Sequence, residues 1–359
     1  MLGWHQILIP QPKRRFPSKV QEEYFPQFSI SLFKCYVCDN SANNIAYNVP
    51  EMMFGFRDVF TYFECSECGC LQISKIPNNI QKYYPSNYYS YSKVEKPDSN
   101  LILIKSILGW IKNKYLLLDG TVLDGLLSRI SCDALEPNVK STLSGIKLAP
   151  NSKILDVGCG SGRFLYHLKE KGFRNLLGCD PYIEKDIEYA NGLRILKKEI
   201  QNIEGKWDLV MFNHSFEHIS DQLETLQSVF RLLEESGICL IRIPTTSSYA
   251  WKHYRTNWFA LDAPRHFFLH SIKSIQILAK KAKLQLKRIV YDSSAQQFWG
   301  SKQYARDIPL HSRMSYAENP KKSIFSKKQI SLFQRKAREL NRKNQGDCAA
   351  FFFIRDPRP

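Results

Sequence analysis

A short apolar run followed by an acid and a glycine-rich turn stands out in this 359-residue chain, at residues 154–164, ILDVGCGSGRF. Ile154–Val157 predicts a strand, and Arg163 opens a predicted helix. Three glycines join the two elements: Gly158, Gly160 and Gly162. Glycines at such a turn let the backbone bend tightly and let a ligand approach it closely. The pattern therefore predicts a site for a nucleoside-containing cofactor.

The acid Asp156 narrows the class of cofactor. The turn reads G-x-G-x-G, whereas the dinucleotide fingerprint is G-x-G-x-x-G with a pyrophosphate at the helix N-terminus. A carboxylate at the strand end would repel a pyrophosphate and attract an ammonium group. S-adenosylmethionine carries an ammonium and a sulfonium and no phosphate, so we predict it as the cofactor.

Later segments supply further candidate cofactor contacts. Asp180 comes 22 residues after Gly158, at the end of the next predicted strand, where it can accept both ribose hydroxyls. Glu199 and Ile200 follow the third predicted strand and are candidates to meet the adenine. Asn213, at the end of the fourth predicted strand, is also assigned to the cofactor.

Methyl transfer from a sulfonium is an in-line displacement, so the residues that matter most orient the acceptor and remove its proton. The loop after the fourth strand, Asn213–Phe216, is not of the Asn-Pro-Pro-Tyr type used for amide and amine acceptors. We therefore expect a hydroxyl or an acidic carbon as the acceptor, with Glu217, His218 or His266 as the base.

Other roles for these side chains stay open. Glu217 can orient backbone, His218 can pack against the cofactor, and His266 can be a surface histidine in its tryptophan-rich segment. With His214, the same three can also hold a divalent ion.

A second motif consists of two C-x2-C pairs separated by 26 residues. Four thiolates on two such hairpins suit a structural zinc ion. The predicted ligands are Cys35, Cys38, Cys65 and Cys68. Cys70 is a possible substitute ligand, and four small buried thiols are the alternative to a metal site.

Short apolar runs alternate with helical stretches after Pro150, which predicts a mostly parallel sheet covered by helices on both faces. The predicted strands are 153–157, 175–179, 193–197, 208–213, 237–243, 285–291 and 349–355. The predicted helices are 162–172, 182–190, 221–235 and 271–283, with a basic helical insertion or solvated face at 321–345. The expected domains are a basic extension (1–34), a zinc-binding module (35–93), a helical connector (94–149) and a catalytic domain (150–359, basic insertion about 306–345).

These residues resemble the Rossmann-like S-adenosylmethionine-dependent methyltransferases, through LDVGCGSG, Asp180 and WDLVMFNHSFEHI (Trp207–Ile219). The N-terminal cysteine module, the tyrosine-rich YYPSNYYSYS and the final GDCAAFFF are similar to sugar C-methyltransferases and relatives in bacterial polysaccharide clusters. The chain departs from the C-methylating group in its shorter gap between the cysteine pairs and in its basic insertion. The resemblance implies a nucleotide sugar or glycan intermediate as the acceptor.

Composition and charge leave two further hypotheses. The formal charge of +17 can attract a diphosphate or an anionic glycan, or else RNA, which the cysteine module and basic insertion would grip. Nucleic acid is the less favoured partner, because no Lys/Arg stripe accompanies the aromatics near Tyr84. A non-catalytic zinc-ribbon interaction protein is the third hypothesis. Residues 101–118 are apolar but interrupted by three lysines, so no transmembrane helix is expected and a cytoplasmic location is predicted.

Overall fold

The computed structural model describes residues 33–85, 146 and 148–356. The predicted helical connector (94–149) lies outside the described residues except for residues 146, 148 and 149. Most of the basic extension and of the tyrosine-rich run also lie outside them. In the part of the chain that is described, no helix is both long and apolar enough to cross a membrane.

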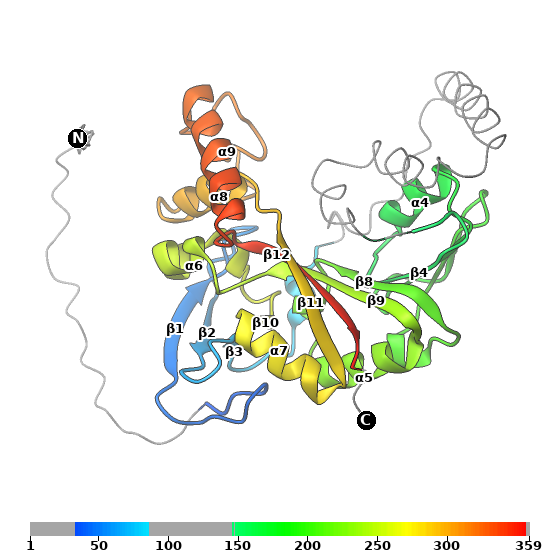
Figure 1. Cartoon of the computed structure of the whole chain (residues 1–359). Helices are drawn as coiled ribbons and strands as arrows, with labels where there is room; N and C mark the ends of the chain where they lie inside the picture. Colours follow the sequence, from blue (N-terminus) through cyan, green and yellow to red (C-terminus); the bar gives the residue numbers. More distant parts are fainter. Residues whose placement is uncertain (1–32, 86–145, 147, 357–359) are drawn as a thin grey trace, which may run out of the picture. The chain divides into compact units, whose positions relative to one another are not determined.

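The predicted parallel sheet is present, with eight strands in the order β11-β12-β9-β8-β4-β5-β7-β6 (Figure 1). Neighbouring strands from β9 to β7 run parallel, while β12 and β6 run antiparallel to their neighbours. The strands are β4 Lys153–Val157, β5 Asn175–Cys179, β6 Ile187–Glu188, β7 Arg194–Leu196, β8 Trp207–Asn213, β9 Leu233–Pro244, β11 Leu284–Tyr291 and β12 Cys348–Arg355. The prediction of a Rossmann-like α/β fold is confirmed, with one short edge strand added.

Alternating side chains of the central strands supply two separate cores, one on each face of the sheet. Leu155 and Val210 point to the face covered by α5 (Gln222–Leu232) and α7 (Ile272–Lys281). Ile154 and Leu209 point to the other face, against α4 (Arg163–Glu170). This is the period-2 pattern expected of a sheet with helices on both sides.

One predicted helix, 182–190, is wrong. The chain there forms β6 and turns back at Asn191–Gly192 into β7, so that Ile187 pairs with Ile195. Gly192 has φ +77°, a value that glycine adopts at little cost. An Asn-Gly pair between two apolar segments is a strong hairpin signal, and here it outweighs the weak helical spacing.

The cysteine-bearing segment forms a second, four-stranded sheet in the order β1-β2-β3-β10. Its first three strands are β1 Ile45–Pro50, β2 Val59–Glu64 and β3 Leu71–Ile73, followed by the short helix η1 Ile80–Tyr83. The fourth strand, β10 Phe268–Leu269, comes from beyond β9 and pairs antiparallel with β3. The two predicted domains therefore share a sheet.

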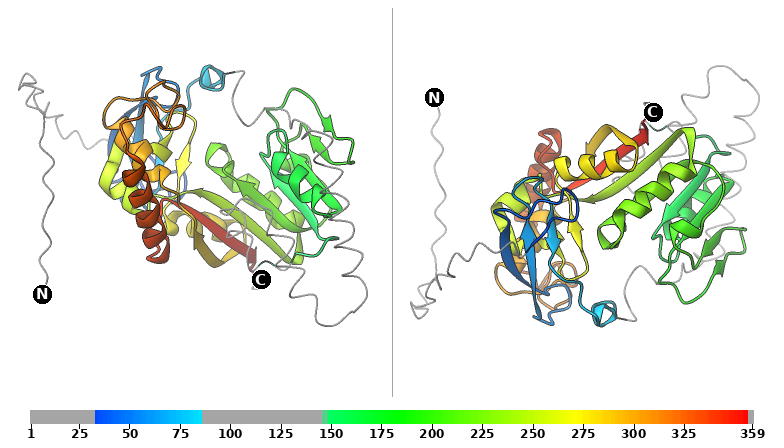
Figure 2. Two further views of the ribbon diagram at one scale, coloured as in Figure 1. Left: turned by 90° about the horizontal axis from the view of Figure 1, so that it is seen from above. Right: turned by 90° about the horizontal axis from the view of Figure 1, so that it is seen from below.

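Most of the basic stretch 321–345 forms a helix. Helix α9 (Lys327–Arg342) starts with a capping box at Ser326 and Gln329 and buries Phe333 and Leu340. It packs on α8 (Gln296–Tyr304), beside β1–β3 in both views of Figure 2. Helix α8 was not predicted from the sequence, nor were the short helices α6 Tyr249–Tyr254, η3 Ile200–Asn202, η4 Phe216–His218, η5 Arg255–Asn257 and η6 Phe259–Leu261.

Candidate active site

A cavity of about 420 Å³ opens at the carboxyl ends of the parallel strands. Its lining includes Val157 and Gly158 after β4, Asp180 after β5, and His214 and Ser215 after β8. β4 pairs with β5 on one side and with β8 on the other, so the strand order reverses there. Open α/β sheets bind ligands at such a switch point.

The glycine turn is tight enough to exclude side chains. Gly158 has φ +69°, and a Cβ atom on it would lie 2.5 Å from the Cβ of Ser215. Gly162 has φ +76° and is the N-cap of α4, where a Cβ would lie 2.2 Å from a methyl carbon of Ile195. Both positions therefore require glycine, which leaves the backbone of the turn bare beside the cavity.

Asp180 braces this turn from the neighbouring strand. Its Oδ2 accepts a hydrogen bond of 2.8 Å from the Gly160 amide, and its Oδ1 accepts one of 2.9 Å from the Tyr182 amide. Each carboxylate oxygen can accept more than one hydrogen bond, so Asp180 keeps acceptor capacity toward the cavity that it lines.

Asp156 is buried directly behind the turn, with a relative exposure of 3%. Its Oδ1 has no hydrogen-bond partner among the described residues. Burial, assisted by the nearby charge of Asp180, raises the pKa of Asp156 to about 8. A buried acid with an unused oxygen suits a cationic ligand group. Asp156 is not among the residues that line the cavity, nor are Gly160 and Gly162, so their assignment to the cofactor stays a prediction.

The other predicted cofactor residues are arranged around the same cavity in different ways. Glu199 and Ile200 line it, Glu199 as the residue before the short helix η3. Asn213 ends β8, where its Oδ1 accepts a hydrogen bond of 3.2 Å from Arg242. Since Asn213 is not among the lining residues, its assignment to the cofactor stays a prediction.

The three candidate bases, Glu217, His218 and His266, lie together. One ligand-type atom from each lies within 4.8 Å of the others, and the two imidazole rings are 4.7 Å apart between centroids. His218 lines the cavity, whereas Glu217 is fully buried and His266 is 8% exposed. Burial lowers the pKa of His218 to about 4, so this imidazole is neutral at physiological pH.

His214 connects this cluster to a buried ion pair. Arg242 contacts Nε2 of His214 and also Oδ2 of Asp292, the latter at 2.5 Å. Because a guanidinium only donates, Nε2 of His214 is the acceptor and its proton is on Nδ1, which lies 3.5 Å from Oε1 of Glu217. His214 has φ +55°, an uncommon conformation for a non-glycine residue and one found at functional sites.

Two parts of the site could not be predicted from sequence spacing. Arg265, whose side chain is fully buried, donates to Glu51 at 2.9 Å and to Asp262 at 2.6 Å. Its backbone carbonyl accepts a hydrogen bond from Nδ1 of His218 at 2.8 Å. Tyr84, from the cysteine-bearing segment, places its hydroxyl 3.1 Å from the same nitrogen and lines the cavity. The sequence feature that could have pointed to Arg265 is its position directly before the candidate base His266.

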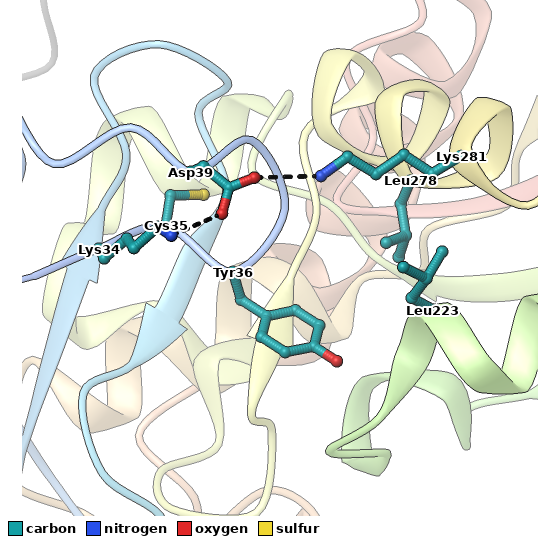
Figure 3. Close-up of a pocket in the computed structure, with 7 residues that line it drawn as sticks. All are labelled: Lys34, Cys35, Tyr36, Asp39, Leu223, Leu278 and Lys281. Atoms are coloured by element: carbon teal, nitrogen blue, oxygen red, sulfur yellow. Dashed lines mark hydrogen bonds and ion pairs between the residues drawn. The ribbon is translucent and has the colours of Figure 1, made fainter.

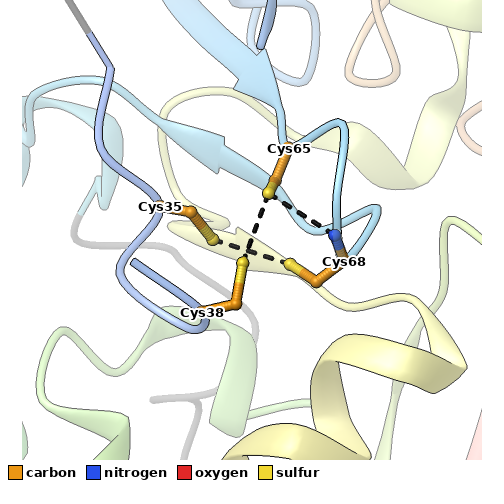
Figure 4. A group of neighbouring side chains, drawn as sticks. All are labelled: Cys35, Cys38, Cys65 and Cys68. Atoms are coloured by element: carbon orange, nitrogen blue, oxygen red, sulfur yellow. Dashed lines mark hydrogen bonds between the residues drawn. The ribbon is translucent and has the colours of Figure 1, made fainter. Parts of the chain in front are cut away.

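The four predicted zinc ligands converge (Figure 4). The sulfurs of Cys35 and Cys68 lie 3.5 Å apart, as do those of Cys38 and Cys65. A tetrahedral zinc tetrathiolate with Zn–S bonds of about 2.3 Å has sulfurs about 3.8 Å apart, so the arrangement fits the metal. Cys70 is buried nearby and is not part of this group.

A second cavity of about 430 Å³ lies where the cysteine-bearing segment meets α5 and α7 (Figure 3). Asp39 pairs there with Lys34 at 3.0 Å and with Lys281 at 3.4 Å. Tyr36 donates a hydrogen bond of 3.0 Å to Asp221, the N-cap residue of α5. These contacts join the cysteine-bearing segment to α5 and α7.

Comparison with known proteins agrees with the large sheet and its cavity. Residues 132–288 match a family model described as a methyltransferase domain. The prediction of such a domain is thereby confirmed, and the match supports S-adenosylmethionine as the methyl donor.

Curated relatives cover only part of the chain. YqeM of Bacillus subtilis (strain 168), a methyltransferase by name, is 27% identical over 143 residues, 36% of this chain and 56% of YqeM. Peramine synthetase ppzA of Metarhizium majus (strain ARSEF 297) is 25% identical over 120 residues, 27% of this chain and 4% of that protein. The chain thus spans at most about half the length of these relatives.

Solved structures share a lower sequence identity with this chain than the curated relatives do. The cyclopropane synthase MmaA2 of Mycobacterium tuberculosis is 15% identical with a TM-score of 0.39, covering 59% of this chain and 81% of that chain. A complex of the Haloferax volcanii Trm112 methyltransferase activator with a methyltransferase gives 15% identity and a TM-score of 0.40, covering 65% and 95%. Scores this low do not bear on function.

Proposed function

We propose that the protein transfers a methyl group from S-adenosylmethionine to a hydroxyl or an acidic carbon of a saccharide. The observation that carries the donor side is the pair of acids, Asp156 and Asp180, at adjacent strand ends around a bare glycine turn. When bound, S-adenosylmethionine supplies a methyl group on a sulfonium, which leaves by in-line displacement. In this proposal Asp156 faces the ammonium group, Asp180 accepts the ribose hydroxyls, and Glu199 and Ile200 lie beside the adenine.

The acceptor side rests on the cluster of Glu217, His218 and His266 and on the character of the cavity wall. Tyr84, Tyr182 and Phe267 line the cavity, and aromatic faces suit the apolar side of a sugar ring. Lys198 lines it as well and can meet a diphosphate. One member of the cluster would accept the proton of the acceptor as the methyl group arrives.

We also propose that Cys35, Cys38, Cys65 and Cys68 hold a structural zinc ion. Four thiolates fill a tetrahedral shell and leave no position for a substrate, so this ion would stabilise the fold and take no part in the reaction. Its support is the convergence of the four sulfurs from two separate loops.

Binding of S-adenosylmethionine tests the donor site directly. We expect Asp180→Ala to weaken binding about 100-fold or more in calorimetry, because two hydrogen bonds to a charged acceptor are lost at about 1.5–3 kcal/mol each. Glu184→Ala removes a carboxylate from the same loop at an exposed position and should bind normally. Equal affinities for the two variants would contradict the assignment.

The raised pKa of Asp156 predicts pH-dependent binding. Below about pH 8 the free protein holds this carboxyl protonated, so binding of an ammonium group must release a proton. The affinity for S-adenosylmethionine should rise by up to about tenfold per pH unit between about pH 6 and pH 7.5, below the range in which an α-amine itself titrates. Asp156→Asn should bind more weakly at pH 7.5 and lose this slope; an unchanged slope would show that another group titrates.

The acceptor can be identified by incubating the protein with methyl-labelled cofactor and a panel of nucleotide sugars and glycans. We expect one compound to gain the mass of a single methyl group. RNA methylation is the alternative function, favoured by the basic helix α9 and the cysteine module. Label found only in RNA, with binding that falls steeply with salt, would replace the saccharide proposal with that one.

A further inference from the structure

We propose that Glu217, His218 and His266 bind a divalent metal ion at the wall of the cavity that His218 lines. Two imidazole nitrogens and one carboxylate oxygen form a ligand set used for Zn²⁺, Mn²⁺ and Fe²⁺, and three protein ligands leave positions open for a substrate oxygen. The inference rests on the proposed function and deepens it, because the same side chains would then act on the acceptor through the ion. The ion would take the place of the base proposed above.

The hydrogen bonds of the two histidines leave the correct nitrogen of each available. Nδ1 of His218 lies 2.8 Å from the Arg265 carbonyl, and Nδ1 of His266 lies 2.8 Å from the Ala260 carbonyl. A carbonyl only accepts, so Nδ1 of each ring carries a proton, and Nε2 is the nitrogen of each ring left to bind a metal. Metal-binding histidines characteristically donate their second N–H to a carbonyl or carboxylate in this way.

Glu217 is a buried carboxylate whose oxygens make only long contacts to imidazole nitrogens. The side chain is 0% exposed, and neither of its oxygens accepts a hydrogen bond from any described residue. The nearest imidazole nitrogens are Nδ1 of His214 at 3.5 Å and Nε2 of His266 at 3.9 Å. These contacts are longer than a good hydrogen bond, and a cation bound between Glu217 and the two histidines would complete the pairing of this buried carboxylate.

The charges of the surrounding network also favour a dication. On one side, Nδ1 of His218 donates a hydrogen bond to the backbone carbonyl of Arg265. On the other side, His214 lies between Glu217 and the guanidinium of Arg242. The network contains four carboxylates and two guanidinium groups: Glu51, Glu217, Asp262, Asp292, Arg242 and Arg265. Four carboxylates against two guanidinium groups leave two excess negative charges on these side chains, which one divalent cation balances.

The ion would assist the transfer without changing its overall balance. An acceptor hydroxyl that binds a divalent ion loses its proton more readily, and the proton passes to water in the open cavity. The oxygen lone pair then forms the new O–C bond as the C–S bond breaks, with its electron pair remaining on sulfur.

Manganese binding tests the site independently of methyl transfer. Zinc-loaded protein is titrated with Mn²⁺ and free Mn²⁺ is followed by electron paramagnetic resonance, since hard Mn²⁺ does not compete well for thiolates. We expect one Mn²⁺ per chain, with ¹⁴N coupling from imidazole in the pulsed spectrum. Glu217→Gln should weaken Mn²⁺ binding at least tenfold, and His218→Gln should reduce the ¹⁴N coupling.

Glu235→Gln is the matched control, since it removes one carboxylate at an exposed position and should leave Mn²⁺ affinity unchanged. Normal binding of S-adenosylmethionine by each variant shows that the fold is intact. If wild type binds Mn²⁺ no more tightly than Glu217→Gln, or without nitrogen coupling, the metal site is refuted while the donor site stands. If S-adenosylmethionine does not bind to wild type, the proposed function fails whatever the Mn²⁺ result.

Discussion

Loss of the zinc ion proposed for the four cysteines is expected to unfold the cysteine-bearing sheet. Structural zinc contributes about 10–16 kcal/mol in zinc-finger peptides, and the first three strands of this sheet span only residues 45–73. Cys68→Ala should release the metal and increase hydrogen exchange across β1–β3, while β4, β5 and β8 stay protected. Zinc content by atomic absorption and exchange by mass spectrometry measure the two effects.

Cys70→Ala is the control, because Cys70 is buried beside the cluster and outside the group of four sulfurs. It should keep one zinc ion per chain and normal protection of β1–β3. Retention of zinc by Cys68→Ala, or its loss from Cys70→Ala, would mean that the ligands are assigned wrongly.

Replacing Arg265 by methionine is expected to lower the free energy of unfolding by about 3–5 kcal/mol. The guanidinium is fully buried and donates to Glu51, to Asp262 and, at 3.1 Å, to the Tyr83 carbonyl. Without it, the buried carboxylate of Glu51 loses its charge partner, and breaking a buried pair by removing one member has this cost. Urea unfolding measures the difference.

The exposed pair of Lys273 and Glu67 provides the comparison. Their side chains are 57% and 62% exposed at a separation of 2.6 Å, so Lys273→Met should cost less than about 1 kcal/mol. Adding Glu51→Gln to Arg265→Met should restore part of the stability, since the unpaired charge is removed. Equal costs for Arg265→Met and Lys273→Met would show that burial adds nothing to the Arg265 pair.

The features predicted well from the sequence are those fixed by local pattern. The strands 153–157 and 175–179 were predicted with their observed bounds, because each is a compact apolar run ending in an acid or a turn. The grouping of the four cysteines was predicted from the spacing of the two C-x2-C pairs alone. The predicted helix at 182–190 is wrong because the turn at Asn191–Gly192 brings β6 back to pair with β7.

The unpredicted part of the site depends on contacts between distant segments. Glu51 and Arg265 are separated by 214 positions, and Tyr84 and His218 by 134. No spacing rule brings such residues together, because the pairing depends on β10 joining β3. The candidate bases were found because Glu217 and His218 are adjacent and follow a strand, whereas the residues that orient them lie elsewhere in the chain.

The shared strand β10 limits how this protein can be re-engineered. Residues 267–269 hydrogen-bond to β3 from inside the segment that also carries Arg265 and His266, and Tyr62 donates to the His266 carbonyl at 2.8 Å. A chimera that takes residues 33–85 from a homologue would pair them with a foreign strand and a foreign arginine. Exchange of acceptor preference between homologues should therefore succeed only when residues 33–85 and residues 259–271 are transplanted together.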